Sequence, residues 1–162
     1  MRKIGIIAVL SLLVTAFAAV PALAQNPHFL PNRGPTFTDL GTQAQVTGTI
    51  AGLGQEPLNV ILEVDAVADV SCFNPGASTG PVPGQAQELT LEAETGAVTP
   101  DRQGRFVITE GALVTATPTV TGAEACPNAK WTATVTDVTF DFTTARILVE
   151  QPIGSDPVQI FP

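Results

Sequence analysis

The chain has 162 residues, with 15 acidic and seven basic side chains and a formal net charge of −8. Hydrophobic residues make up 44%, which is too high for a disordered chain, and the length suits a single domain behind a leader. The excess of negative charge disfavours nucleic acid and anionic lipid as partners.

Residues 1–24 have the features of a secretory signal peptide. Arg2 and Lys3 form a positive region, an apolar run follows over 4–20, and 22–24 read Ala-Leu-Ala, which fits the small-x-small cleavage rule. The alternative is a retained membrane anchor, but the apolar run is slightly short for a bilayer span. We therefore expect cleavage, no membrane span in the mature chain, and a secreted, extracellular or cell-envelope location.

Residues 25–35 contain three prolines and no hydrophobic periodicity. This composition predicts an extended N-terminal arm, or a mobile terminus, ahead of the domain. His28, the only histidine, lies in the arm. We expect a solvated side chain there, not a metal ligand or a catalytic base.

From residue 36 the pattern is β throughout, and it predicts an antiparallel β-sandwich domain over 36–150 with a C-terminal tail over 151–162. A closed barrel is the alternative. No helical period occurs in the mature chain. The seven to eight strands are expected at 36–38, 43–51, 60–72, 88–93, 105–109, 113–121, 131–142 and 145–150. Residues 158–161 either add a short strand or stay loose.

The longest strand pattern spans residues 60–72. Apolar residues occupy every even position and alternate with polar or acidic residues such as Asp65 and Asp69. This alternation predicts one buried face and one solvent-exposed face. The small Ala66 and Ala68 predict close approach of the opposite sheet or of a large side chain such as Trp131.

Three further features predict local geometry. The segment 101–104 reads Asp-Arg-Gln-Gly, a hairpin signal with glycine placed for positive φ. The apolar alternation that begins at Trp131 changes phase at Asp137, which predicts a β-bulge. Thr143-Thr144 is expected to form the turn before the last strand. Pro118 places its strand at an edge or at a bulge.

Cys72 and Cys126 are the only cysteines. In an exported protein they most simply form one disulfide, closing a loop of about 54 residues with an upper stabilisation of roughly 4 kcal/mol. No CxxC or neighbouring histidine supports a metal site instead. Immunoglobulin domains place a tryptophan between their cysteines, whereas Trp131 follows Cys126 and the chain has no tyrosine. The sandwich is therefore Ig-like only in the general sense.

Two segments resemble a group of uncharacterised secreted bacterial proteins that are Thr/Val-rich β-domains with a single disulfide. They are Cys72-Phe73-Asn74-Pro75-Gly76 with Pro83-Gly84-Gln85, and Cys126-Pro127-Asn128 with residues 131–139. The resemblance covers most of the mature chain. It implies an extracellular location and the pairing of the two cysteine segments, but it carries over no activity and no catalytic residues.

Candidate catalytic groups are few. Ser-His-Asp chemistry needs a base beside the nucleophile, and the single histidine lies in the arm. Two carboxylates could act on a glycan, since Asp65 and Asp69 share a strand face and Asp137 and Asp141 lie near the bulge. Without tyrosine and with one tryptophan, no aromatic platform for sugar is evident. We expect a solvated acidic face, no catalytic residues, no cofactor and no metal; weak calcium binding at Asp137 is the minor alternative.

The loop 73–87 after the long strand is the best candidate for a binding site. It is tied down at Cys72, stiffened by prolines and loosened by glycines, and long loops on a rigid sandwich often bind partners. The alternative is a plain connector. Phe73 could be an exposed anchor, or could plug the core beside the disulfide, which we favour. The candidate binding residues are Phe73, Asn74, Pro75, Pro81 and Pro83.

Three classes of function are compatible with these features. The first is a secreted non-catalytic β-sandwich module with a structural, adhesive or assembly role, whose partner is an envelope or extracellular protein or a second copy. The second is a ligand- or protein-binding domain, such as an inhibitor, that uses the loop 73–87. A glycan-directed enzyme ranks last.

Overall fold

The computed structural model describes residues 26–76 and 80–161, so the predicted signal peptide lies outside the described residues. The described chain is almost entirely β and forms two antiparallel sheets, which confirms the predicted all-β sandwich. Its elements are β1 His28–Phe29, β2 Thr36–Asp39, β3 Ala44–Ala51, β4 Asn59–Phe73, β5 Val82–Pro83, β6 Gln87–Glu94, β7 Phe106–Ile108, α1 Gly122–Ala125, β8 Thr132–Glu150 and β9 Val158–Phe161.

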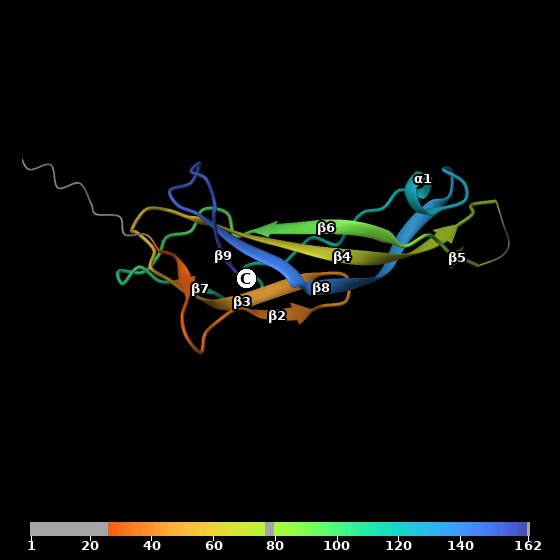
Figure 1. Ribbon diagram of the computed structural model, residues 1–162. Helices are drawn as coiled ribbons and strands as arrows, with labels where there is room; N and C mark the ends of the chain where they lie inside the picture. Colours follow the sequence, from red (N-terminus) through yellow and green to blue (C-terminus); the bar gives the residue numbers. More distant parts are fainter. Residues whose placement is uncertain (1–25, 77–79, 162) are drawn as a thin grey trace, which may run out of the picture.

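The larger sheet is built on β4. This strand pairs with β8 along one side and with β5 and β6 along the other, and β9 pairs with β8 beyond them. The smaller sheet is built on β3, which pairs with β1, β2 and β7. Figure 1 shows the smaller sheet beneath one half of the larger one, while β4 and β8 continue past it.

The alternation in β4 is confirmed. Its seven even-numbered residues from Val60 to Cys72 are each 5% exposed or less. They line the inner face because successive side chains of a strand point to opposite sides of the sheet. The main core joins Leu62 of β4 to Ile50 of the smaller sheet and Ile147 of β8, and so holds the two sheets together.

Ala66 and Ala68 lie where phenylalanine rings fill the interior. They share a cluster with Phe140, against which the half-buried Phe37 and Phe142 pack. The ring centroids of Phe37, from the smaller sheet, and Phe142 are 5.3 Å apart. The predicted approach of the opposite sheet is therefore confirmed, whereas Trp131 does not belong to this cluster.

The predicted strand at 113–121 is wrong. Within it Val114 forms a single bridge to Gln45, and the Thr115 hydroxyl accepts a hydrogen bond from the Ala44 amide at 2.8 Å. A one-turn helix that the sequence did not predict, α1, follows this segment. The carboxylate of Glu124 accepts hydrogen bonds from both the amide and the hydroxyl of Thr121, and these bonds stabilise the turn at its start.

The predicted bulge at Asp137 is confirmed, but the predicted turn at 143–144 is wrong. Asp69 of β4 is paired with Asp137, and Val70 with Val135, so Thr136 is extra. Strand β8 then runs without a turn through Thr143 and Thr144. A second register shift falls there, where several β8 residues oppose Val64 of β4 alone. The two threonines therefore mark a bulge.

The predicted turn at 101–104 is confirmed, with Gly104 at a φ of +67°. The N-terminal arm is extended, as predicted, but it is joined to the domain, because β1 pairs with β3 and the Leu30 amide donates to the Thr49 carbonyl at 2.9 Å. The tail also contributes a strand, β9, on the edge of β8. The sandwich therefore extends beyond 36–150 at both ends.

We expect Leu62→Ala to lower the free energy of unfolding by about 2–5 kcal/mol, because it leaves a cavity between the two sheets. Val67→Ala on the same strand, where the side chain is 41% exposed, should change it by less than about 0.5 kcal/mol. Urea denaturation of both variants measures the difference. Equal effects would contradict the assignment of the two faces of β4.

Candidate functional site

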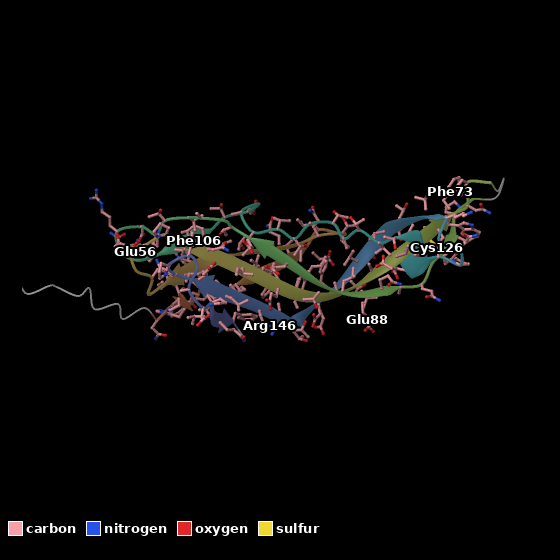
Figure 2. All side chains as sticks on the ribbon, turned by 90° about the horizontal axis from the view of Figure 1, so that it is seen from above. Glu56, Phe73, Glu88, Phe106, Cys126 and Arg146 are labelled. Atoms are coloured by element: carbon pink, nitrogen blue, oxygen red, sulfur yellow. A yellow bond between two sulfur atoms is a disulfide. The ribbon has the colours of Figure 1, made fainter. Side chains whose placement is uncertain are left out.

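The end of the molecule farthest from the smaller sheet forms a separate feature, which we call the tip. It comprises residues 70–76 and 80–87 and residues 120–135, with β5 and α1 among them. Figure 2 shows Phe73 and Cys126 at this end, Glu56 and Phe106 at the opposite end, and Glu88 between them. The molecule is therefore elongated along β4 and β8.

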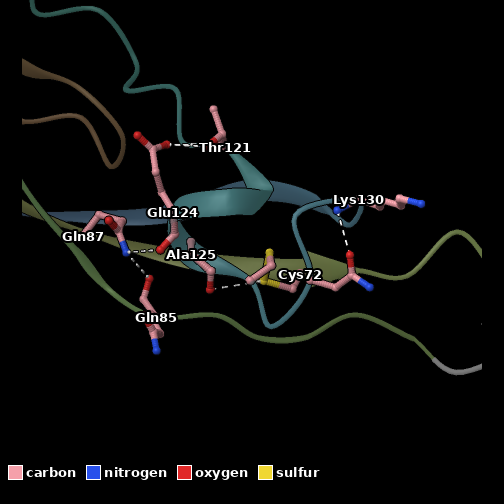
Figure 3. The surroundings of a disulfide bond; sticks show 9 residues. Cys72, Gln85, Gln87, Thr121, Glu124, Ala125 and Lys130 are labelled. Atoms are coloured by element: carbon pink, nitrogen blue, oxygen red, sulfur yellow. Dashed lines mark hydrogen bonds between the residues drawn. A yellow bond between two sulfur atoms is a disulfide. The ribbon is translucent and has the colours of Figure 1, made fainter.

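The predicted disulfide is present at the tip. Cys72 and Cys126 are joined, with Cα atoms 5.7 Å apart, and Cys72 is 1% exposed. The bond connects the end of β4 to the residue that follows α1 (Figure 3). A small cluster of Val70, Val120 and Ala125 packs beside it. The main core does not reach the tip, so this cluster and the disulfide stabilise the tip in its place.

The second half of the loop 73–87 is fixed by backbone hydrogen bonds. The Gly84 amide donates to the Val70 carbonyl at 2.7 Å, and the Gln85 amide donates to the Ala125 carbonyl at 2.8 Å. A Cβ atom at position 84 would lie 2.9 Å from the Cys72 sulfur and 3.0 Å from the Ala125 carbonyl oxygen. Only glycine fits there, so this part of the loop is packed against the disulfide.

Phe73 does not plug the core; it is 45% exposed. Its side chain lies on the outer face of β4, since its even-numbered neighbour Cys72 points inward. Pro83 pairs with Ser71 and shares that outer face. Pro75 and Pro81 are also exposed, and the Asn74 side chain accepts a hydrogen bond from the Gly76 amide at 3.1 Å. The structure thus brings the candidate binding residues to the surface of the tip.

Charge is distributed unevenly along the molecule. Residues 70–87 contain no acidic or basic side chain. By contrast, the outer face of β4, β6 and β8 carries nine carboxylates and one basic side chain, Arg146, which pairs with Glu63 at 3.1 Å. The carboxylates are Glu63, Asp65, Asp69, Glu88, Glu92, Glu94, Asp137, Asp141 and Glu150.

The carboxylates predicted as candidates face one another across strands. Asp65 is opposite Asp141, and Asp69 is opposite Asp137. The sequence placed Asp65 and Asp69 on one strand and Asp137 and Asp141 on another. It did not reveal how the two strands align, because the bulge at Thr136 and the larger shift near Thr143 determine their register. Like charges directly opposite destabilise a sheet, so this arrangement costs stability.

A groove of about 680 Å³ crosses the same face at Asp65. The strand pairing arranges the side chains along the groove in two rows of three, and each row runs across β6, β4 and β8. One row is Thr90, Asp65 and Asp141, and the other is Glu88, Val67 and Thr139. The Thr90 hydroxyl donates to Asp65 at 2.8 Å, which orients that carboxylate.

Two of these carboxyl groups have displaced pKa values. Hydrogen bonds from the side chain and the amide of Thr143 lower the pKa of Asp141. Partial desolvation raises the pKa of Glu92, and the neighbouring Glu94 and Glu63 raise it further. A glycoside hydrolase needs a carboxyl group that stays protonated near its substrate. The pKa of Asp141, which lies in the groove, is lowered, so this carboxyl group does not meet that requirement.

His28 lies on β1, and its Nδ1 is 2.8 Å from the Asn26 carbonyl oxygen. Within residues 26–76 and 80–161, no group of three or more His, Cys, Asp or Glu side chains is arranged to hold a metal ion. In the same part of the chain, no helix is long and apolar enough to cross a membrane.

Comparison with known proteins gives no match to this chain: no family model, no curated protein and no solved structure is similar to it.

We expect Gly84→Ala to lower the free energy of unfolding by about 1–3 kcal/mol, because the new methyl group meets the disulfide and two carbonyl oxygens. Gly80→Ala is the matched control, since a Cβ there has no neighbour within 4 Å; it should be neutral or slightly stabilising. Thermal denaturation compares the two. If both variants melt alike, position 84 is not packed as described.

We expect Glu92→Gln to raise the melting temperature at pH 7. The folded protein raises the pKa of this acid, so the ionised form costs stability above the folded pKa, and the cost disappears as pH falls below the unfolded value of about 4.3. At about pH 3 the variant and the parent should therefore melt alike. Glu56→Gln, outside this face, is the control. A Glu92→Gln benefit that persists at low pH would refute the charge-crowding explanation.

Proposed function

We propose that the protein is an exported, non-catalytic β-sandwich module that attaches to another macromolecule of the cell envelope or its surroundings through the tip. The role is adhesive or assembly-related. This proposal combines the first two functional classes predicted from the sequence, because the tip supplies the contact that an adhesive module needs.

The observation that carries the proposal is the exposure of Phe73 at a rigid strand end. An aromatic side chain that is 45% exposed offers apolar area to a partner, and aromatic residues are enriched at the centres of protein interfaces. The preceding residue is held by the disulfide, and β8 pairs with β4 up to Phe73 itself. Such an anchor loses little conformational entropy when it binds.

The charge distribution supports contact at the tip. The nearest carboxylate before Phe73 on its own strand is Asp69, four residues or about 13 Å away. Screening in 0.1 M salt acts over about 10 Å. In the rest of the tip, residues 120–135 carry one carboxylate, Glu124, and one basic side chain, Lys130, so the tip has no net charge. It can therefore approach an anionic surface that repels the acidic remainder of the molecule. The exposed prolines add stiff apolar surface without charge.

An extracellular setting is compatible with the covalent structure. The disulfide persists in oxidising compartments, and the leader over 1–24 has the pattern of an export signal.

The test compares beads coated with mature protein for attachment to envelope fractions of the producing organism. We expect Phe73→Ser to reduce attachment at least tenfold, equivalent to about 1.4 kcal/mol of lost binding free energy. Raising the salt concentration should change attachment little. The control is Val107→Ser, which removes a 54% exposed apolar residue from β7 and should attach like the parent. Undiminished attachment of Phe73→Ser would refute a contact at the tip.

A further inference from the structure

We propose that the groove on the outer face of β4, β6 and β8 is a second docking surface, and that it receives a segment of another protein that presents arginine or lysine. The inference does not depend on the tip, because the groove lies midway along the molecule, at the level of Glu88 in Figure 2.

The first support is the shape and composition of the face. No element among the described residues covers the outer side of β4 at Asp65 and Val67, both of which are exposed. The groove of about 680 Å³ is in the range of pockets that bind ligands, and adjacent strands put its columns about 4.8 Å apart. It is large enough for several side chains of a peptide.

The second support is the placement of an apolar residue beside the opposed carboxylates. Val67, 41% exposed, lies in the middle of one row, and Asp65 lies in the middle of the next, directly opposite Asp141. Arginine and lysine have an aliphatic stem and a charged end. The stem fits over Val67 while the charged end reaches the two carboxylates.

The carboxylates are oriented to accept such a group. The Oδ1 atom of Asp65 accepts from Thr90, and the Oδ1 atom of Asp141 accepts from the amide and hydroxyl of Thr143. Among the described residues, the Oδ2 atoms of both make no hydrogen bond. A guanidinium carries five N–H donors in a planar fork, so one arginine can bridge both oxygens. Its charge also removes the cost of the like-charged pair.

Charge complementarity selects a basic protein over other occupants. A second copy of the chain fits poorly, because Arg146, already paired with Glu63, is the one basic residue on this face. Nucleic acids and anionic lipids are repelled. No set of three ligands for a metal ion occurs in the described part of the chain. A basic polypeptide segment satisfies both the apolar and the acidic side chains of the groove.

The experiment measures binding of an octapeptide of alternating arginine and serine to the mature protein by fluorescence anisotropy. We expect saturable binding that weakens as salt rises. The triple variant Asp65→Asn, Glu88→Gln, Asp141→Asn should bind about tenfold more weakly, since three exposed charge contacts are lost. Circular dichroism verifies that it folds. Val67→Ser, which removes the apolar patch without changing the charge, should also weaken binding.

The control changes the same number of charges elsewhere. Glu56→Gln, Glu110→Gln, Asp156→Asn gives an identical net charge and alters exposed residues outside the groove; it should bind like the parent. Equal weakening of both triple variants would reduce the effect to net charge and overturn the proposal, as would absence of binding to the parent. A mass increase of the protein alone in sedimentation, abolished by the groove variant, would instead identify a second copy as the occupant.

Because Phe73→Ser leaves the groove intact, it should bind the peptide normally. Failure of tip-mediated attachment and failure of the groove are therefore distinguishable.

Discussion

The ladder between β4 and β8 is the interaction on which the rest of the structure depends. Strand β4 pairs with β8 over its entire length, from Asn59 to Phe73. This length exceeds the reach of the smaller sheet, so one half of the ladder is covered by β3 and its neighbours and the other half by α1 and the segment before it. The two halves have separate apolar clusters, and the disulfide stabilises the half that has the smaller one. A tip held away from the body is the direct result.

The same ladder determines where the carboxylates meet. The extra residue Thr136 makes the registers on its two sides differ by one. If the register of Val70 and Val135 continued without it, Asp137 would lie opposite the inward-facing Ala68 and would not share a face with Asp69. The shift near Thr143 likewise brings Asp141 opposite Asp65. Both bulges thus place negative charge on the wet face of β4, where the core does not require it.

The sequence predicted the features that depend on local pattern and failed where distant contacts decide. Period-two alternation located β4 and its buried face, and the phase change located the bulge at Asp137. Residues 113–121 have strand composition, but only Val114 forms a bridge, because the segment crosses from the smaller sheet to α1. Thr143-Thr144 has turn composition, yet pairing with β4 on one side keeps β8 extended. The exposure of Phe73, by contrast, follows from the same alternation that buries Cys72, so the favoured prediction of a core plug conflicted with the period-two pattern. In the fold, Val70, Val120 and Ala125 fill the space beside the disulfide.

The described ends of the chain, β1 and β9, lie in contact with each other in the body of the sandwich, away from the tip. A molecule tethered near either end and held by a partner at Phe73 would therefore carry tension along its long axis. That direction runs parallel to β4 and β8. A pull on Phe73 passes directly into β4 and, through the Cys72–Cys126 disulfide, into the segment that leads to β8. Resistance to forced unfolding is governed by the unfolding rate and not by equilibrium stability. The disulfide thus distributes a load at the tip over both long strands.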